Sequence, residues 1–296
     1  MIFLKKFELL TEDEEWREFL PSGRFCKHTD DEYYPYQIFP QKQFETIDFD
    51  DITLFYGGNG SGKTTLLNII ADKLKIYRIT SCPQTIGFGY YLDICRYSTQ
   101  KPISVRSKFL ASDDVFNHIL SVREENKGIA AHKQAEREYH WQAKQGMHAV
   151  TSIDFESENY KKEIEKLRIF NEARRKTTRQ FIRSRAGELQ RQYSNGENAL
   201  MFFDKQIEEN ALYLLDEPEN SMSPKFQLEL KTLIEDSVRY KNCQFVIATH
   251  SPFILSLWDA KIYNLDATPV TVERWYELEN VRYYYDFFKS HKDLFE

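Results

Sequence analysis

"GGNGSGKTT", residues 57–65, lies between the apolar segment DITLFY (51–56) and the segment LLNIIADKL (66–74). A strand, a glycine-rich loop and a helix in this order form the context in which Gly-x-x-x-x-Gly-Lys-Thr holds a polyphosphate. The glycines let successive backbone amides turn inward, and the helix N-terminus adds a partial positive charge. We expect Lys63 to lie against the β and γ phosphates and the Thr64 hydroxyl to bind Mg2+. The segment therefore predicts a site for a nucleoside triphosphate, made by Gly57, Gly58, Asn59, Gly60, Ser61, Gly62, Lys63, Thr64 and Thr65.

Length and composition limit the class of protein. With 296 residues, 41% of them hydrophobic, the chain forms one large domain or one domain with a big insertion. Cys26, Cys82, Cys95 and Cys243 lack the Cys-x-x-Cys spacing of zinc sites, which indicates reduced thiols and favours a cytoplasmic location. No apolar run approaches the roughly 18 residues of a membrane helix, so we expect no direct membrane insertion. The net charge of -6 argues against general binding of polyanions.

Apolar segments alternate with helical segments along most of the chain, which predicts a mostly parallel α/β core. Several of the apolar segments are nearly continuous, as strands covered on both faces must be. In the helix expected near residues 223–240, Ser223 is the predicted cap and Pro224 takes the first helical position. The predicted strands lie within residues 1–10, 46–56, 75–80, 211–217, 243–250, 260–266 and 269–278.

The middle of the chain differs in character. Residues 112–192 are polar, lack strand patterns and are predicted to form helices. We interpret them as a helical subdomain inserted into the α/β core. Residues 1–111 then make the first part of the core, and residues 193–296 make the second part.

Chemically active side chains follow two of the predicted strands. Asp216 and Glu217 end the strand in LYLLDEPEN (212–220), and His250 ends the strand in VIATHSPF (246–253). Two acidic residues before a proline can simply end a strand, and a lone histidine is often structural. With a phosphate loop upstream, we expect Asp216 to hold Mg2+ through water, Glu217 to act as general base and His250 to bond the γ phosphate.

Ser194-Asn195-Gly196-Glu197 has the pattern of a helix start. Ser194 can cap the helix, and the Glu197 side chain, three residues on, can reach back to the amide of the cap. Asp216 follows Ser194 by 22 residues (216 − 194), which is room for one helix and one strand.

These motifs, in this order, resemble an ATPase of the ABC superfamily. The resemblance assigns Walker A to residues 57–65, the signature to residues 194–197, the end of Walker B to Asp216-Glu217, the D-loop to residues 219–223 and the switch histidine to His250. It implies a P-loop NTPase of the α/β class, with an ABC-type core that has a mostly parallel sheet, N-terminal antiparallel strands and an inserted helical subdomain.

The resemblance also implies a mechanism. Two copies form a head-to-tail homodimer around two ATP molecules and separate after hydrolysis, with Mg2+ as cofactor. The signature residues of one copy then contact the ATP held by the other copy; these residues are Ser194, Asn195, Gly196 and Glu197.

Departures from the family pattern narrow the choice of relatives. The usual Leu-Ser-Gly-Gly-Gln is Tyr-Ser-Asn-Gly-Glu here, and "DEPENSMSP" (216–224) is more similar to non-transport members. Those are the structural-maintenance-of-chromosomes and recombination-repair ATPases, the overcoming-lysogenisation-defect nucleases and the ATPases of bacterial defence operons. Gln84 and Gln100 are the candidates for the Q-loop. Tyr36 or Phe39 is the expected adenine-stacking residue, with Tyr33, Tyr34 and Phe44 nearby.

The favoured function is a cytoplasmic ATPase that regulates or drives a separate effector protein in DNA maintenance or antiviral defence. The alternative is the nucleotide-binding subunit of a membrane transporter. A nucleotide-gated scaffold without turnover is disfavoured because Glu217 is present.

The segment from Lys161 to Arg191 carries eleven basic and four acidic side chains, against the acidic balance of the whole chain. One interpretation is a solvated helical face with internal ion pairs, Glu163 with Lys166 and Glu172 with Lys176. The other is a surface that binds nucleic acid or an acidic partner.

Overall fold

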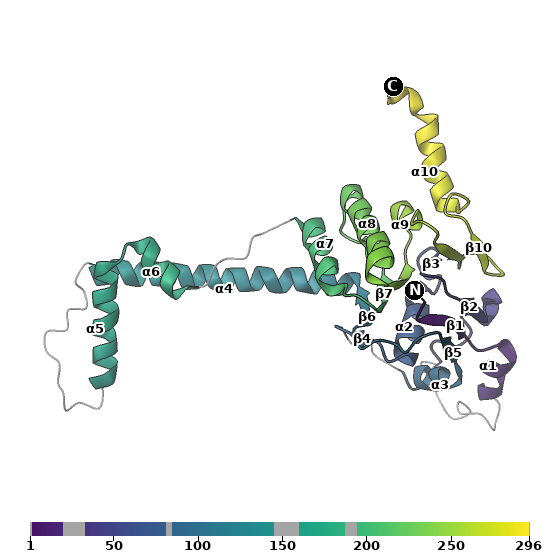
Figure 1. Cartoon of the computed structure of the whole chain (residues 1–296), viewed down its shortest axis with the longest axis horizontal. Helices are drawn as coiled ribbons and strands as arrows, with labels where there is room; N and C mark the ends of the chain where they lie inside the picture. The colour runs from purple at the N-terminus through teal and green to yellow at the C-terminus, as the bar shows by residue number, and fades with distance from the viewer. Residues whose placement is uncertain (1, 20–32, 81–84, 145–159, 187–193, 296) are drawn as a thin grey trace. The chain divides into compact units, whose positions relative to one another are not determined.

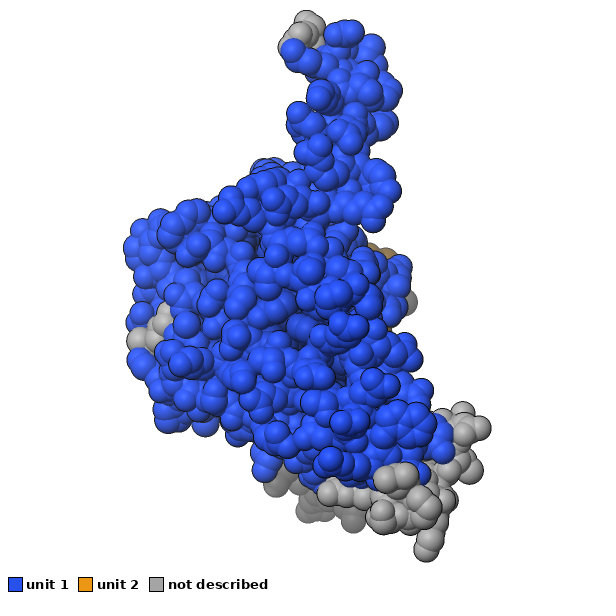
Figure 2. All heavy atoms as spheres, turned by 90° about the vertical axis from the view of Figure 1, so that its right-hand side faces the viewer, with its two compact units in different colours: residues 1–116, 194–296 blue, residues 117–193 orange. Residues whose placement is uncertain are grey.

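The computed structural model describes residues 2–19, 33–80, 85–144, 160–186 and 194–295. The chain divides into two compact units, one made by residues 1–116 and 194–296 and the other by residues 117–193 (Figure 2). None of the described helices combines the length and the apolar character needed to cross a bilayer.

The first unit is built on a seven-stranded sheet with the order β10-β9-β3-β8-β7-β6-β4 (Figure 1). All neighbouring strands are parallel except β9 and β10, which are antiparallel. Every residue of β3 and β8 is buried, as the apolar sequences of these strands predict. The strands are β3 (Ile52–Tyr56), β4 (Tyr77–Arg78), β6 (Lys108–Ala111), β7 (Leu212–Asp216), β8 (Gln244–Ala248), β9 (Lys261–Asn264) and β10 (Thr271–Glu273).

A second, antiparallel sheet has the order β2-β1-β5, with β1 at Leu4–Glu8, β2 at Thr46–Asp48 and β5 at Arg96–Thr99. The Gln244 side chain joins the two sheets. Its Oε1 accepts from the amides of Phe3 and Leu4 at 2.8 and 2.9 Å, and its Nε2 donates to the carbonyls of Leu4 and Asp50 at 2.9 and 3.0 Å. The mostly parallel α/β core with N-terminal antiparallel strands is therefore confirmed.

Helices cover both faces of the parallel sheet. Figure 1 shows α2 on one face and the group α7, α8 and α9 on the other. The α2 helix buries Leu66, Leu67, Ile69 and Ile70 against β7 and β8. The helices are α1 (Glu12–Phe19), α2 (Lys63–Lys73), α3 (Ile86–Ile94), α7 (Asn195–Gln206), α8 (Pro224–Lys241), α9 (Pro252–Leu255) and α10 (Glu279–Ser290), with short 3-10 turns η2 (Pro40–Lys42) and η3 (Lys292–Leu294).

The structure differs from the sequence predictions for this unit at three points. Residues 46–56 form two strands in different sheets rather than one, because Phe49 turns into the core between β2 and β3. Strands β5 and β6 were not predicted, since each has only four residues and no strong alternation. Ser223 occupies the cap position of α8, but its side chain makes no capping hydrogen bond.

The second unit is helical. It contains most of α4 (Ser112–Lys144), together with α5 (Tyr160–Arg175) and α6 (Thr178–Arg185). Its small core forms around buried Phe181, against which Tyr139 and Phe170 pack. Residues 177 and 180 form a complete capping box at the start of α6.

The basic segment from Lys161 to Arg191 lies in this unit, and the structure describes part of it. The predicted pair Glu172 and Lys176 is formed at 2.5 Å, and Arg185 lies 3.6 Å from Glu136. The side chains of Glu163 and Lys166 and the residues from 187 to Arg191 lie outside the described part of the chain.

Candidate functional site

The glycine-rich loop lies between β3 and α2, at the carboxyl edge of the parallel sheet. Gly60 and Gly62 have φ angles of 80° and 97°, which a residue with a side chain rarely adopts. The buried Lys63 turns its ammonium back into the loop and donates to the carbonyl of Gly57 at 2.7 Å and of Gly58 at 3.0 Å. Asn59 and Thr64 are exposed, Thr65 is half-buried and Ser61 is buried. The loop thus gathers amides and one cation around a space suited to phosphate.

Asp216 ends β7 beside the start of α2. Its Oδ1 accepts a hydrogen bond from the Thr64 hydroxyl at 3.1 Å, and burial raises the pKa of this carboxyl to about 6. A hydroxyl and a carboxylate side by side fit Mg2+, which takes one or two protein oxygens and completes its shell with phosphate and water. Thr64 and Asp216 would hold the ion, and the ion would neutralise charge on the phosphates.

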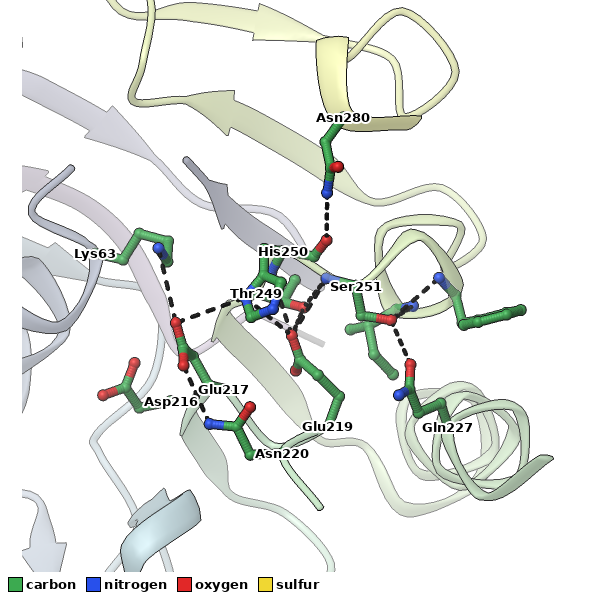
Figure 3. A network of polar contacts seen from close by, with 12 residues as sticks. Lys63, Asp216, Glu217, Glu219, Asn220, Gln227, Thr249, His250, Ser251 and Asn280 are labelled. Atoms are coloured by element: carbon green, nitrogen blue, oxygen red, sulfur yellow. Dashed lines mark hydrogen bonds and ion pairs between the residues drawn. The ribbon is translucent and has the colours of Figure 1, made fainter. Parts of the chain in front are cut away.

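Glu217 lies next to Lys63 and His250 (Figure 3). Its Oε1 is 3.8 Å from the Lys63 ammonium and 3.6 Å from His250 Nδ1, and its Oε2 accepts from Asn220 Nδ2 at 3.1 Å. Glu217 has a φ of 45°, and its amide donates to the carbonyl of Ala248 at 2.9 Å, so the turn after β7 is tied to the end of β8. His250 is 48% exposed and free to meet a ligand. A carboxylate, an imidazole and an ammonium thus converge on one point, as base-assisted attack of water requires.

Glu219 belongs to this group, although its residue type alone did not suggest a role in the site. The side chain is only 4% exposed, and its Oε1 accepts from the Thr249 hydroxyl at 2.5 Å and from the amides of His250 and Ser251 at 3.2 Å each (Figure 3). Burial raises the pKa of this carboxyl. Glu219 therefore joins the loop after β7 to the loop that carries His250. Its three donors are about thirty residues away, so only the folded chain reveals the contact.

The predicted signature lies at the start of α7. Ser194 is its cap and accepts from the Glu197 amide at 3.3 Å, but the reciprocal bond from the Glu197 side chain is not formed among the described residues. Ser194 and Asn195 are exposed, whereas Gly196 is buried, and a Cβ there would lie 2.7 Å from the Phe226 ring. Within the described residues, no hydrogen bond or ion pair joins Ser194 to Lys63 or Glu217. The chain thus brings the phosphate loop, both carboxylates and His250 together and presents the signature separately.

The expected adenine-stacking residues need correction. Tyr36 and Phe39 are 5% and 0% exposed, so neither has a free face for a base. Tyr34, which was only a neighbour in the sequence, is 41% exposed, and its hydroxyl donates to Thr65 Oγ1 at 2.9 Å. Its ring stacks on Phe88 with centroids 5.9 Å apart. Tyr34 is therefore an exposed aromatic residue of this group that contacts the phosphate-loop helix, whereas Phe39 packs beneath the loop near Gly62.

Only one of the two Q-loop candidates lies in the described part of the chain, and that residue is not at the site. Gln84 lies outside the described residues, and Gln100 follows β5 in the antiparallel sheet. The strand next to β7 is β6, where Ala111 pairs with Asp216, so the start of α4 lies at the same edge as the carboxylates. There, Asp114 accepts from the Ala111 amide at 2.9 Å and from the Thr80 hydroxyl at 2.6 Å. If β6 had been recognised in the sequence, the start of α4 would have been expected at this edge of the sheet.

Asp266 is a further contact of the phosphate loop. Its Oδ2 accepts from the Gly58 amide at 2.8 Å, and its own amide donates to Asn264 Oδ1 at 3.0 Å. The end of β9 thereby fixes one amide of the loop. No motif in the sequence indicates this contact.

Comparison with protein families gives two matches. The family described as ABC transporter matches residues 45–220, and the family described as AAA ATPase domain matches residues 192–255. No curated protein matches the chain.

Several solved structures are similar to the chain. The Smc head domain of Pyrococcus furiosus, with an extended coiled coil and bound to the C-terminal domain of ScpA, is 14% identical over 94% of this chain and 98% of that chain, with a TM-score of 0.42. The SMC head domain from Thermotoga maritima is 12% identical over 92% of this chain and 99% of that chain, with a TM-score of 0.40. A putative metal-chelate type ABC transporter in an inward-facing conformation is 19% identical over 80% of this chain and 76% of that chain, with a TM-score of 0.36.

Proposed function

The chain belongs to the ABC transporter family and is an ABC-type ATPase, and on that premise we propose that two copies close head to tail around two ATP molecules to regulate or drive a separate effector protein. The observation that carries this proposal is the division of the site. Lys63, Asp216, Glu217 and His250 converge at one edge of the sheet, while Ser194 and Asn195 present an exposed helix start that their own site does not use.

The residues of one copy then have separate tasks. Lys63 leaves the carbonyls of Gly57 and Gly58 and donates to the β and γ phosphates. Glu217 takes a proton from the attacking water, and His250, 3.6 Å away, bonds the γ phosphate and orients the carboxylate. Thr64 and Asp216 would hold Mg2+, which would supply positive charge to the phosphates.

The second copy supplies the remaining donors. The start of α7 carries the positive end of the helix dipole, and the exposed Ser194 adds a hydroxyl, so this helix start suits the γ phosphate of an opposing ATP. The buried Gly196 lets α7 lie against Phe226 at the start of α8, which sets the direction of those amides.

Glu217→Gln tests the sandwich. This variant keeps the shape of the site but lacks the base, so it is expected to accumulate an ATP-bound dimer, seen by size-exclusion chromatography with light scattering. A variant that binds ATP and stays monomeric would contradict the head-to-tail model.

Two further variants separate the halves of the site. Lys63→Ala should lose ATP binding and turnover, whereas Ser194→Arg should keep ATP binding by each monomer and lose dimer closure and hydrolysis. Glu229→Ala, on a partly exposed position of α8, is the matched control and should keep wild-type activity. Wild-type turnover by Ser194→Arg would show that the signature does not act across a dimer.

DNA maintenance or antiviral defence in the cytoplasm is the proposed setting. The departures of the signature and the D-loop from the transporter pattern support it, and Cys95 and Cys243 are buried and free, which is consistent with a reducing compartment. Affinity capture from native cells with Glu217→Gln distinguishes the settings. A soluble nuclease or other effector is the expected partner, and a membrane permease would instead identify a transporter subunit, which the family match favours as the alternative.

Nucleic acid is the second proposed partner, through the segment from Lys161 to Arg191. Within its described part, Arg168, Arg175, Arg179 and Arg183 are exposed. Electrophoretic mobility of duplex DNA and RNA, at low and moderate salt and with and without ATP, should show a salt-sensitive shift. No shift in any of these states would leave the segment a solvated helical face.

A further inference from the structure

The α10 helix carries an unusually aromatic surface. Five of its twelve residues are aromatic with between 48% and 65% of each side chain exposed: Tyr283, Tyr284, Tyr285, Phe287 and Phe288. At 100° per residue these rings cover roughly half of the helix circumference, while Glu279, Arg282, Asp286 and Lys289 share the opposite side. Figure 2 shows α10 standing out from the rest of the first unit. An apolar arc of this size is unusual on the surface of a monomer and indicates a contact with another protein.

A groove runs between this arc and the core of the first unit. Its volume is about 690 Å3, and most of the side chains that line it are apolar. Among them are Met222, Pro252, Phe253, Trp275, Tyr284 and Phe288. The groove can therefore hold several apolar side chains of a partner, which is how the centre of a stable protein interface is built.

The groove is also part of the nucleotide edge of the sheet. Asn220, Glu219 and His250 line it, and all three contact the catalytic group described above. The start of α10 is fixed there, because Asn280 Nδ2 donates to the His250 carbonyl at 3.1 Å (Figure 3). The Asn280 amide also donates to the Tyr56 hydroxyl at 3.2 Å. Displacement of the His250 loop by a nucleotide would therefore move the base of α10.

We propose that this groove and the aromatic arc of α10 bind the α10 helix of a second copy of the chain in the ATP-bound dimer. This inference rests on the proposed head-to-tail dimer. A copy whose Ser194 reaches the phosphates at Lys63 must approach the same edge of the sheet on which α10 is mounted. A two-fold dimer uses the same surface patch of both copies, and a segment that lies near the two-fold axis meets its own counterpart, which is the position that we assign to α10. The aromatic side chains of each helix would then pack on the aromatic side chains that line the opposite groove, which include Phe253 and Trp275.

The test uses Glu217→Gln as the parent and introduces Tyr284→Glu with Phe288→Glu. We expect the dissociation constant of the ATP-bound dimer to rise at least about thirtyfold, as for the loss of an aromatic anchor, with unchanged affinity of the monomer for ATP. Tyr240→Glu is the matched control, because Tyr240 is also an exposed tyrosine (72%) but lies at the end of α8 next to the opposite edge of the sheet. Analytical ultracentrifugation with Mg-ATP measures the dimer, and ATP titration of each variant verifies its fold.

A second measurement leaves the other aromatic side chains in place. In the same parent, a short bismaleimide should join Tyr284→Cys to the second copy in an ATP-dependent reaction. The Tyr240→Cys variant should give no more cross-linked dimer than the parent gives. A double glutamate variant that dimerises as tightly as its parent, with no ATP-dependent link at residue 284, would overturn the inference and leave the sandwich model intact. A parent that binds ATP without dimerising would overturn both. A variant that keeps its dimer but loses a co-purifying protein would assign the groove to that protein and overturn the inference.

Discussion

Replacing Glu219 by alanine should loosen the contact between the two loops of the active site. The carboxylate accepts three hydrogen bonds through Oε1, from the Thr249 hydroxyl and from the amides of His250 and Ser251. A hydrogen bond contributes about 1 kcal/mol net, and buried donors left without a partner add to the loss. We therefore expect Glu219→Ala to lower the free energy of unfolding by about 3 kcal/mol.

Glutamine at the same position separates hydrogen bonding from charge. Its Oε1 can keep the three donors, and its amide nitrogen takes the place of Oε2, which has no hydrogen-bond partner among the described residues. Glu219→Gln also removes a buried charge, so we expect its stability to stay within about 1 kcal/mol of wild type. Glu229→Ala, at a partly exposed position of α8, is the control and should change stability by less than about 0.5 kcal/mol.

Urea unfolding of the nucleotide-free protein, followed by circular dichroism, measures these differences. Turnover should follow the same order, because His250 is positioned only while its loop is tied to Glu219. The reasoning is refuted if the alanine and glutamine variants lose equal stability, since the three bonds would then contribute nothing.

Three further perturbations test other parts of the fold. Gly62→Ala should lower the free energy of unfolding by about 1–2 kcal/mol, because the position has a φ of 97°. It should also weaken ATP binding in thermal-shift titrations. Unchanged stability and ATP affinity would show that the loop can relax. Tyr34→Ala should raise the dissociation constant for ATP about tenfold, whereas Tyr34→Phe keeps the stacking ring; equal affinities measured by calorimetry would exclude the base contact. Burial raises the pKa of Glu15 from 4.5 to about 7, so the folded chain holds this proton more tightly than the unfolded chain, and stability should fall by on the order of 3 kcal/mol as the pH rises from about 4.5 to 7. Glu15→Gln should remove this part of the pH dependence in urea unfolding at pH 5 and 7.5, and an identical dependence in both proteins would contradict it.

The sequence predicts best where one short segment carries both the fold and the chemistry. Residues 51–74 indicate a strand, a loop and a helix in one stretch. The carboxyl ends of parallel strands meet at one edge of the sheet, which is why Asp216 and His250 could be expected beside Lys63. The same reasoning missed β6, because KFLA offers four residues and no long alternating pattern, although this strand lies between β7 and β4 in the sheet.

Exposure and distant partners are harder to read from a sequence. Tyr36 and Phe39 are as aromatic as Tyr34, and only packing decides that the first two lie in the core. The partners of Glu219 and the contact between Asn280 and His250 depend on how loops from different strands meet. The groove beside the aromatic arc of α10 likewise depends on the position of the helix and not on its residue types alone.

The position of β3 in the sheet has a consequence for how the protein is made. This strand, which leads into the phosphate loop, has β8 on one side and β9 on the other, and both strands follow it by more than 180 residues along the chain. During synthesis, the phosphate-loop strand therefore emerges long before either of its neighbours. Pairings of such long sequence separation form slowly and leave apolar strand edges exposed in the meantime. A nascent chain that stops before Gln244 would carry the complete glycine-rich loop yet lack both strands that hold it, so ATPase activity begins only after residues 244–264 have been made.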